Sequence, residues 1–212
     1  KNIFKVSSIL LVLGALIILG AGCEKAPTPL AEYTGARFAV AVPNGTAGLY
    51  LAYKALGLKE GDEIITSPNT FVATSNMAIE CGAKVVLCDI RLDTYNLDET
   101  KLEKLITKRT KVIVPVHFAG HPCEMDAIHA IAKKYNIKIV EDACHAIGAE
   151  YNNKRIGGLS DMSVFSFHPV KPITTGEGGA ILTNDEEYYK KMLILRTHGI
   201  IKDPARTESM GK

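Results

Sequence analysis

The chain has 212 residues, of which 47% are hydrophobic and 23% are charged, and its formal net charge is +2. This length and composition favour one large globular domain with a substantial core. A net charge so close to zero argues against a nucleic-acid partner. The five cysteines form an odd number and contain no CxxC pair, which favours reduced, cytosolic thiols over a disulfide framework.

The N-terminal segment, residues 1–29, differs from the rest of the chain. Lys1 and Lys5 precede an uncharged apolar stretch from Val6 to Cys23, which ends in the sequence Leu-Gly-Ala-Gly-Cys. This pattern is typical of a signal peptide of the lipoprotein type, with Cys23 as the lipid-bearing residue. The stretch is short for a helix that spans a membrane.

From residue 38 onward, short β-branched runs alternate with helical patterns. This alternation predicts an α/β fold with a mostly parallel, mixed sheet and helices on both faces, including an antiparallel strand near the ligand site. The expected strands are Phe38–Val42, Glu63–Thr66, Lys84–Asp89, Val112–His117, Lys138–Glu141, Ser163–Phe167 and Ala180–Thr183. The expected helices are Ala47–Leu56, Val72–Cys81, Asp98–Ile106, Met125–Tyr135 and Asp185–Arg196.

A candidate anion site lies in Pro43-Asn-Gly-Thr-Ala-Gly48, between the first expected strand and the first expected helix. Gly45 and Thr46 would lie at the helix N-terminus, where free N–H groups and the helix dipole favour a phosphate. The alternative is an ordinary N-cap, which Asn or Thr also supplies.

Two further segments carry side chains of types that can bind a metal ion or a small molecule. His117, His121 and Cys123 lie close enough together to suggest zinc, but no fourth ligand follows at a recognisable spacing, so we predict no metal site. Ile137-Lys-Ile-Val-Glu-Asp142 is expected to be a short strand that ends in two carboxylates. Ligands bind at the carboxyl ends of strands in open α/β sheets, although Asp142 in the alternative reading caps the following turn.

Lys171 lies between an apolar, strand-like run and a glycine-rich turn. Pro169 and Pro172 fix φ and restrain the residue before each, so this lysine fits a helix interior poorly. A lysine held stiffly at the end of a buried strand indicates an amine that must be aimed, as in a Schiff base with a carbonyl substrate or with pyridoxal phosphate (PLP). With PLP, Asp142 would pair with the protonated pyridine nitrogen. The alternative is a solvated surface lysine.

Several motifs together carry a resemblance to a known family. They are Asn44-Gly-Thr-Ala, Gly61-Asp-Glu-Ile-Ile-Thr, Asn69-Thr-Phe-Val-Ala-Thr-Ser-Asn76, Thr107-Lys-Arg-Thr-Lys-Val-Ile-Val-Pro-Val-His117, Glu141-Asp-Ala-Cys-His-Ala-Ile-Gly-Ala-Glu150, Phe165-Ser-Phe-His168 and Glu177-Gly-Gly179. On these motifs, the stretch from about Leu30 to Lys202 resembles the DegT/DnrJ/EryC1/StrS sugar aminotransferases. The resemblance implies the PLP-binding large domain of the aspartate-aminotransferase fold (type I) for residues 30–202.

The same resemblance assigns roles to seven residues. Lys171 would bind PLP covalently and act as the proton-transferring base, Asp142 would pair with the pyridine nitrogen, and His145 would lie near the phenolic oxygen of the cofactor. A lone histidine is otherwise more often structural. Related dehydratases carry histidine at the lysine position, so the lysine found here favours transamination.

The remaining assignments concern the ring and the phosphate of PLP. Phe71 would stack on the cofactor ring, and its alternative is a core phenylalanine at the start of a helix. Gly45, Thr46 and Ser166 would hold the phosphate, although a serine in a strand is often just a hydrogen-bonded core group.

The activity implied by the resemblance is a ping-pong transfer of an amino group, usually from glutamate, to the keto carbon of a nucleotide-linked 4-ketosugar. The substrate would be a UDP-4-keto-6-deoxy-N-acetylhexosamine used to make surface glycans, because His168–Thr175 is similar to transaminases on the route to pseudaminic acid. The family implies a homodimer at full length and a cytoplasmic location.

The two ends of the chain leave alternatives open. Residues 1–29 do not match the family, so we expect either a fusion, frameshift or assembly error or a genuine membrane anchor. Residues 203–212 would be a truncated tail without the C-terminal small domain. Two other functions therefore stay open: an inactive remnant that retains PLP or partner binding, and a membrane-tethered, lipoprotein-like binding module.

Overall fold

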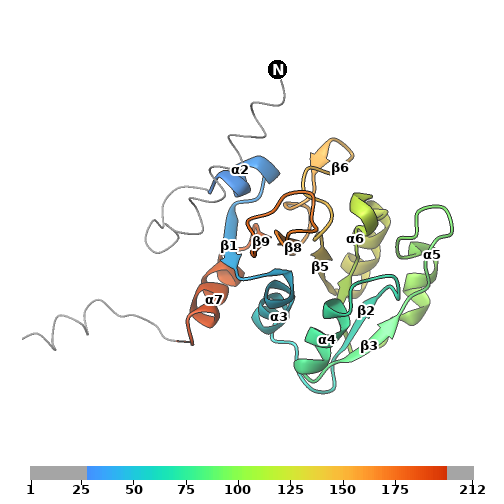
Figure 1. Ribbon diagram of the computed structural model, residues 1–212. Helices are drawn as coiled ribbons and strands as arrows, with labels where there is room; N and C mark the ends of the chain where they lie inside the picture. The colour runs from blue at the N-terminus through green and yellow to red at the C-terminus, as the bar shows by residue number, and fades with distance from the viewer. Residues whose placement is uncertain (1–27, 200–212) are drawn as a thin grey trace, which may run out of the picture.

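Within residues 28–199, which the computed structural model describes, a seven-stranded sheet forms the centre of the protein (Figure 1). The strand order is β1-β9-β8-β5-β4-β2-β3, and a separate hairpin pairs β6 with β7. The strands are β1 (Phe38–Val42), β2 (Glu63–Thr66), β3 (Lys84–Leu87), β4 (Thr110–Val114), β5 (Lys138–Asp142), β6 (Glu150–Tyr151), β7 (Lys154–Arg155), β8 (Met162–Ser166) and β9 (Gly179–Thr183).

The direction of the strands confirms the predicted mixed sheet. Strands β3, β2, β4, β5 and β8 pair in parallel, whereas β9 is antiparallel to both of its neighbours, β8 and β1. The carboxyl ends of β5 and β8 therefore meet at one edge of the sheet, next to the amino end of β9. Strands β2, β8 and β9 are buried at every position, as expected where both faces of a sheet are covered.

Helices cover both faces of the sheet (Figure 1). Along β4, Val112 and Val114 pack in the same cluster as α3, α4 and α7, whereas the intervening Ile113 packs with α5 and α6. This alternation follows from the two-residue period of a strand. The helices are α2 (Pro29–Thr34), α3 (Gly45–Leu56), α4 (Ala73–Glu80), α5 (Glu99–Leu102), α6 (Met125–Tyr135) and α7 (Glu186–Arg196), with 3₁₀ turns η1 (Glu103–Leu105) and η2 (Phe118–Gly120).

The structure differs from the predicted elements at several boundaries. The strand predicted over Val112–His117 ends at Val114, because Pro115 has no N–H with which to continue the ladder. The strand predicted to reach Asp89 ends at Leu87, and the predicted helix Asp98–Ile106 divides into α5 and η1. The short helix α2 and the β6–β7 hairpin were not predicted, because each is too short to show a periodic pattern.

Some predictions concern residues outside the described range. These are the lipid-bearing Cys23, most of segment 1–29 and the tail 203–212. In the described part of the chain, no helix is long and apolar enough to cross a membrane. The four cysteines within residues 28–199 are free thiols.

The packing of α3 on the sheet yields a first prediction. A Cβ atom added to Gly48 would lie 2.7 Å from Val164 Cγ1. We expect Gly48→Ala to lower the free energy of unfolding by about 1 kcal/mol, because overpacking costs roughly 1–3 kcal/mol and helix propensity returns at most about 1 kcal/mol. Urea unfolding of the purified chain measures the change. In a Val164→Ala background the same substitution should be neutral or stabilising, and a stabilising effect in the unsubstituted background would contradict the close contact.

Candidate active site

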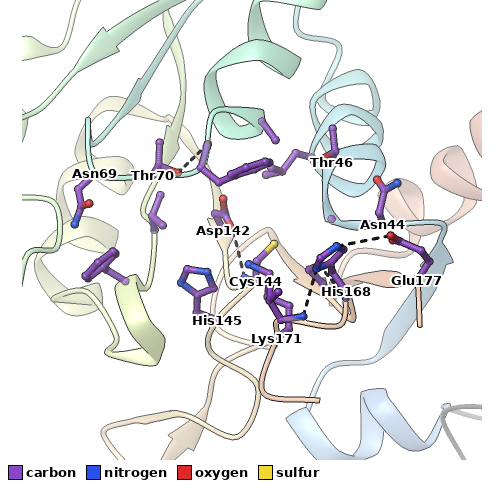
Figure 2. A pocket seen from close by; sticks show the side chains of 18 residues that line it. Asn44, Thr46, Asn69, Thr70, Asp142, Cys144, His145, His168, Lys171 and Glu177 are labelled. Carbon is purple, nitrogen blue, oxygen red and sulfur yellow. Dashed lines mark hydrogen bonds and ion pairs between the residues drawn. The ribbon is translucent and has the colours of Figure 1, made fainter. Parts of the chain in front are cut away.

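A pocket of about 540 Å³ opens where α3, the segment before α4, the end of β5 and the β8–β9 loop meet (Figure 2). Its volume lies within the range of roughly 300–1,000 Å³ that is typical of small-molecule sites. All the residues that the sequence singled out for PLP line this one pocket: Gly45, Thr46, Phe71, Asp142, His145, Ser166 and Lys171. These residues span 127 positions of sequence, so only the fold brings them together.

The N-terminus of α3 forms one end of the pocket. The Asn44 side chain accepts a hydrogen bond from the Ala47 N–H at 2.8 Å and caps the helix, and the Gly48 N–H donates to the Asn44 carbonyl. The N–H groups of Gly45 and Thr46 therefore have no acceptor within the helix and are available to an anion. The cap and the anion seat, which the sequence left as alternatives, are thus compatible.

Glycine is required at the start of α3 by its neighbours. A Cβ atom on Gly45 would lie 2.9 Å from Cys144 Sγ and 3.1 Å from Ser166 Cβ. The absence of this atom lets the helix N-terminus approach the end of β8. Ser166 is buried there, and its hydroxyl oxygen accepts a hydrogen bond from the His168 N–H at 3.4 Å.

Asp142 is the last residue of β5 and is only 5% exposed. Its Oδ2 atom accepts a hydrogen bond of 2.6 Å from the Thr74 hydroxyl. Its Oδ1 atom accepts one of 3.2 Å from the Cys144 N–H (Figure 2). The second bond is the turn cap that the sequence left open for this aspartate. The carboxylate still lines the pocket, so capping does not remove it from the site.

Lys171 does not lie at the end of a strand, as the sequence had suggested. Strand β8 ends at Ser166, and the lysine follows five positions later in the irregular loop before β9. Its N–H donates to the His168 carbonyl at 2.9 Å, and the Thr175 N–H and the Thr174 hydroxyl both donate to the Phe167 carbonyl. The loop, rather than a strand, holds the partly buried lysine at the pocket (Figure 2).

The charges in the pocket act on its histidine and its thiol. Burial, with a further contribution from the positive charge of Lys171, lowers the pKa of His145, while Asp142 opposes this shift. His145 is therefore biased toward the neutral form. Burial and then the negative charge of Asp142 raise the pKa of the Cys144 thiol well above its usual value, so this cysteine stays protonated.

Phe71 lies before α4 with 68% of its surface exposed, which contradicts the alternative of a core phenylalanine. Its ring is part of the pocket wall. An exposed aromatic ring in a pocket is available to stack on a bound ring.

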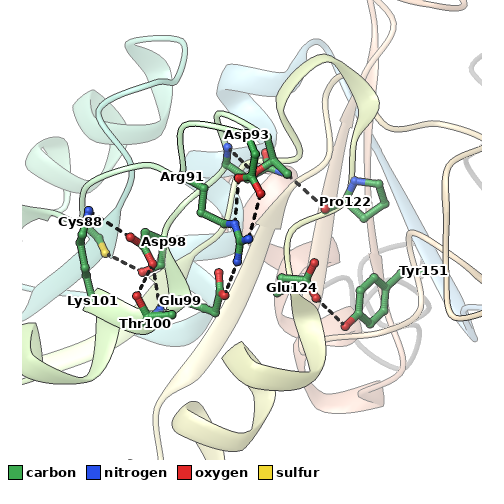
Figure 3. A network of polar contacts seen from close by, with 12 residues as sticks. Cys88, Arg91, Asp93, Asp98, Glu99, Thr100, Lys101, Pro122, Glu124 and Tyr151 are labelled. Carbon is green, nitrogen blue, oxygen red and sulfur yellow. Dashed lines mark hydrogen bonds and ion pairs between the residues drawn. The ribbon is translucent and has the colours of Figure 1, made fainter.

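The connection between β3 and α5 supports the part of the pocket wall that Phe118 forms. Asn96 accepts a hydrogen bond from the Phe118 N–H at 2.9 Å, and its own amide donates to the His121 carbonyl, also at 2.9 Å. Nearby, Arg91 holds Asp93 with two hydrogen bonds and Glu99 with a third (Figure 3). These contacts fix the connection that positions Phe118 in the pocket.

The predicted absence of a metal site concerned His117, His121 and Cys123. His117 is fully buried, and its Nδ1 atom accepts a hydrogen bond from the Cys123 N–H at 3.1 Å. Its Nε2–H therefore donates to Glu141 at 2.8 Å. Among residues 28–199, no group of three or more His, Cys, Asp or Glu side chains is arranged to hold a metal ion.

Sequence reasoning missed several residues of the site. Asn69, Thr70, Val116, Phe118, His168 and Glu177 also line the pocket, and Thr74 lies behind it against Asp142. The motif Asn69–Asn76 contains both Thr70 and Thr74, but nothing in its pattern shows which threonine faces Asp142, 68 positions away.

Comparisons with known proteins agree with this geometry. A model of the DegT/DnrJ/EryC1/StrS aminotransferase family matches residues 10–211, a range that begins inside the N-terminal apolar segment. The chain is 49% identical over 176 residues to the UDP-4-amino-4,6-dideoxy-N-acetyl-beta-L-altrosamine transaminase of Campylobacter jejuni, and the alignment covers 82% of this chain and 46% of that protein. The chain thus spans about half the length of the curated relatives it matches.

Solved structures show the same relationship. PseC of Helicobacter pylori, an aminotransferase involved in the biosynthesis of pseudoaminic acid, has a TM-score of 0.79 and 43% identity, over 82% of this chain and 47% of its own. A putative sugar aminotransferase from Streptococcus pneumoniae, solved in its PMP form, has a TM-score of 0.80 and 35% identity, over 86% of this chain and 51% of its own. Together with the family match over almost the whole sequence, these similarities show that the chain belongs to the DegT/DnrJ/EryC1/StrS aminotransferase family.

Proposed function

We propose that this chain is the cofactor-binding part of a PLP-dependent sugar aminotransferase. The enzyme transfers an amino group from glutamate to the keto carbon of a nucleotide-linked 4-ketosugar, namely a UDP-4-keto-6-deoxy-N-acetylhexosamine. The observation that carries this proposal is the convergence of the seven candidate residues on one pocket. The names of the relatives in Campylobacter and Helicobacter support the sugar and its use in pseudaminic acid biosynthesis.

The residues present fit PLP. The N-terminus of α3 offers two N–H groups and a threonine hydroxyl to a phosphate, beside the hydroxyl of Ser166. Phe71 supplies an exposed ring for stacking, and Asp142 supplies a carboxylate with both oxygens already oriented by donors. Lys171 lines the same pocket. PLP carries a phosphate, an aromatic pyridine ring with a ring nitrogen, and an aldehyde. The phosphate seat, the stacking ring, the carboxylate and the amine of this pocket match these groups in turn.

Each residue then has a specific task. When bound, PLP supplies an electron sink that stabilises the charge left on a carbon after proton removal. Asp142 keeps the pyridine nitrogen protonated, which makes that sink effective. The Lys171 amine would hold the cofactor. Once released, this amine would take the proton from the α-carbon of the amino donor and deliver it to the cofactor. Neutral His145, which lines the same pocket, would hydrogen-bond the phenolic oxygen of the cofactor.

The proposal extends to the surroundings of the enzyme. We expect the full-length protein to form a homodimer and to work in the cytoplasm, where PLP, glutamate and nucleotide sugars occur together. Nothing in the charge of the chain favours a nucleic-acid partner. A membrane location would depend on the apolar segment 1–29, most of which lies outside the described residues.

The cofactor and the lysine are tested together. Purified chain incubated with PLP should show a visible absorption band that borohydride converts into a stable adduct, and peptide mapping should find the label on Lys171. Lys171→Ala should lack both the band and the label, because no other lysine within residues 28–199 lines the pocket. Lys108→Ala, a change at an exposed lysine that does not line the pocket, serves as the matched control and should behave like the unsubstituted chain.

The amino transfer has its own test. With glutamate and the UDP-4-ketosugar, we expect 2-oxoglutarate to form together with a 4-amino sugar, and neither product should form with Lys171→Ala. Product formation is followed by mass spectrometry. A chain that labels at Lys171 but never turns over would leave PLP binding intact and would favour the reading of a non-catalytic remnant.

The lowered pKa of His145 predicts a pH dependence of stability. The unfolded chain binds this proton more readily than the folded chain, so stability falls as the pH drops below about 6.5, the ordinary histidine value. His145→Gln removes the group, and the variant should lose less stability than the unsubstituted chain between about pH 7 and pH 5. Urea unfolding without added PLP at a series of pH values measures this. Parallel curves for the two proteins would show that the histidine is not biased toward neutrality.

A further inference from the structure

Thr74 is a fully buried residue in the first turn of α4, and the proposed mechanism does not use it. Its hydroxyl donates to Asp142 Oδ2 at 2.6 Å, which is short for a hydrogen bond between side chains. The other carboxylate oxygen, Oδ1, accepts from the Cys144 N–H at 3.2 Å. Because both oxygens have a donor, the carboxylate cannot rotate about its Cβ–Cγ bond without losing a hydrogen bond. The χ2 angle of aspartate is otherwise broad and weakly held.

A second threonine fixes the direction of this bond. Thr70 Oγ1 and Thr74 Oγ1 lie 2.7 Å apart, and either atom alone would be able to donate. A hydroxyl has one proton, and that of Thr74 is committed to Asp142. The Thr70 hydroxyl has two acceptors within reach, and Thr74 Oγ1 at 2.7 Å is nearer than the Phe71 carbonyl at 3.3 Å. Thr70 therefore donates to Thr74, which gives a directed chain of hydrogen bonds from Thr70 through Thr74 to Asp142.

Thr74 also connects the elements that surround the pocket. The Tyr53 hydroxyl, from α3, donates to the Thr74 carbonyl at 3.0 Å, and Tyr53 is fully buried. The same helix α3 begins at the phosphate seat, and Phe71 lies next to Thr70. The helix of the phosphate seat, the segment of the stacking ring and the carboxylate thus all meet at Thr74. Thr70 and Asp142 line the pocket (Figure 2), whereas Thr74 touches Asp142 from behind.

We propose that Thr74 is a positioning residue that aims the Asp142 carboxylate at the pyridine nitrogen of PLP and holds it in register with Phe71. This inference rests on the proposed function, because it assumes that PLP occupies the pocket. Without the Thr74 hydroxyl, the carboxylate keeps one donor only and its rotation is released. Its pairing with the pyridine nitrogen weakens, and that nitrogen then loses its proton at a lower pH.

The test compares Thr74→Val, which keeps the shape and removes the hydroxyl, with Thr74→Ser, which keeps the hydroxyl. Thr183→Val is the matched control, because Thr183 is also fully buried and donates at 2.6 Å, to the Asp161 carbonyl, but does not line the pocket. The readouts are the dissociation constant of PLP, the pH midpoint for deprotonation of the pyridine nitrogen of the bound cofactor, followed by NMR of nitrogen-labelled PLP, and urea unfolding without PLP.

For Thr74→Val we expect PLP affinity to fall by about tenfold and the pH midpoint to fall by roughly one unit, since a hydrogen bond to a charged group is lost. Thr74→Ser should restore both values. Thr183→Val should lose stability without moving either value. Equal affinity and an equal midpoint in Thr74→Val and the unsubstituted chain would overturn the inference and leave Thr74 a merely structural residue.

If Thr74→Val does not fold, Thr70→Val replaces it, because Thr70 is only partly buried; its midpoint should move in the same direction, and an unmoved midpoint overturns the inference. If the unsubstituted chain binds no PLP, both the proposed function and this inference fail. Binding by the unsubstituted chain without any effect of the variants overturns the inference alone.

Discussion

The close approach of α3 to the carboxyl edge of the sheet is the contact on which the pocket depends. Added Cβ atoms at Gly45, Gly48 and Gly179 would each lie under 3 Å from a neighbouring atom, and at Gly179 those atoms belong to the backbone of Asn44 and Phe165. Only glycine allows backbone to meet backbone at this distance. The helix N-terminus therefore lies directly beside the ends of β5 and β8, where its free N–H groups reach the same cavity as Asp142.

The two carboxylates that end β5, Glu141 and Asp142, point to opposite faces of the sheet and have different surroundings. Glu141 points to one side, where it accepts a hydrogen bond from His117 in a fully buried pair, and Asp142 points to the pocket. Burying a carboxylate oxygen without a hydrogen bond is costly. Both oxygens of Asp142 have donors, whereas Glu141 is held through Oε2, and its buried Oε1 atom has no hydrogen-bond partner among the described residues. The hydrogen bond on the far face ties β5 to the segment that follows β4, while the donors on the near face orient the Asp142 carboxylate in the pocket.

Lys171 illustrates a different way to hold a reactive side chain. A ladder position in β8 would have fixed its direction relative to the sheet, whereas the loop before β9 lets the amine lie over the pocket. Hydrogen bonds from Thr174 and Thr175 to the Phe167 carbonyl close the loop on itself. The lysine is thus confined by turns and prolines at the wall of the pocket.

The sequence by itself determined most of the element types, the bounds of Phe38–Val42 and Met125–Tyr135, and the placement of Gly45 and Thr46 at a helix N-terminus. It did so because local caps, prolines and periodic apolar positions act over a few residues. It also indicated the family, through motifs that are specific as a set. Tertiary structure alone decided that β9 inserts between β1 and β8, that Lys171 lies in a loop, and that Thr74 holds Asp142. These depend on contacts between residues far apart in the chain, whose energies are set by packing and hydrogen bonding after the sheet has formed.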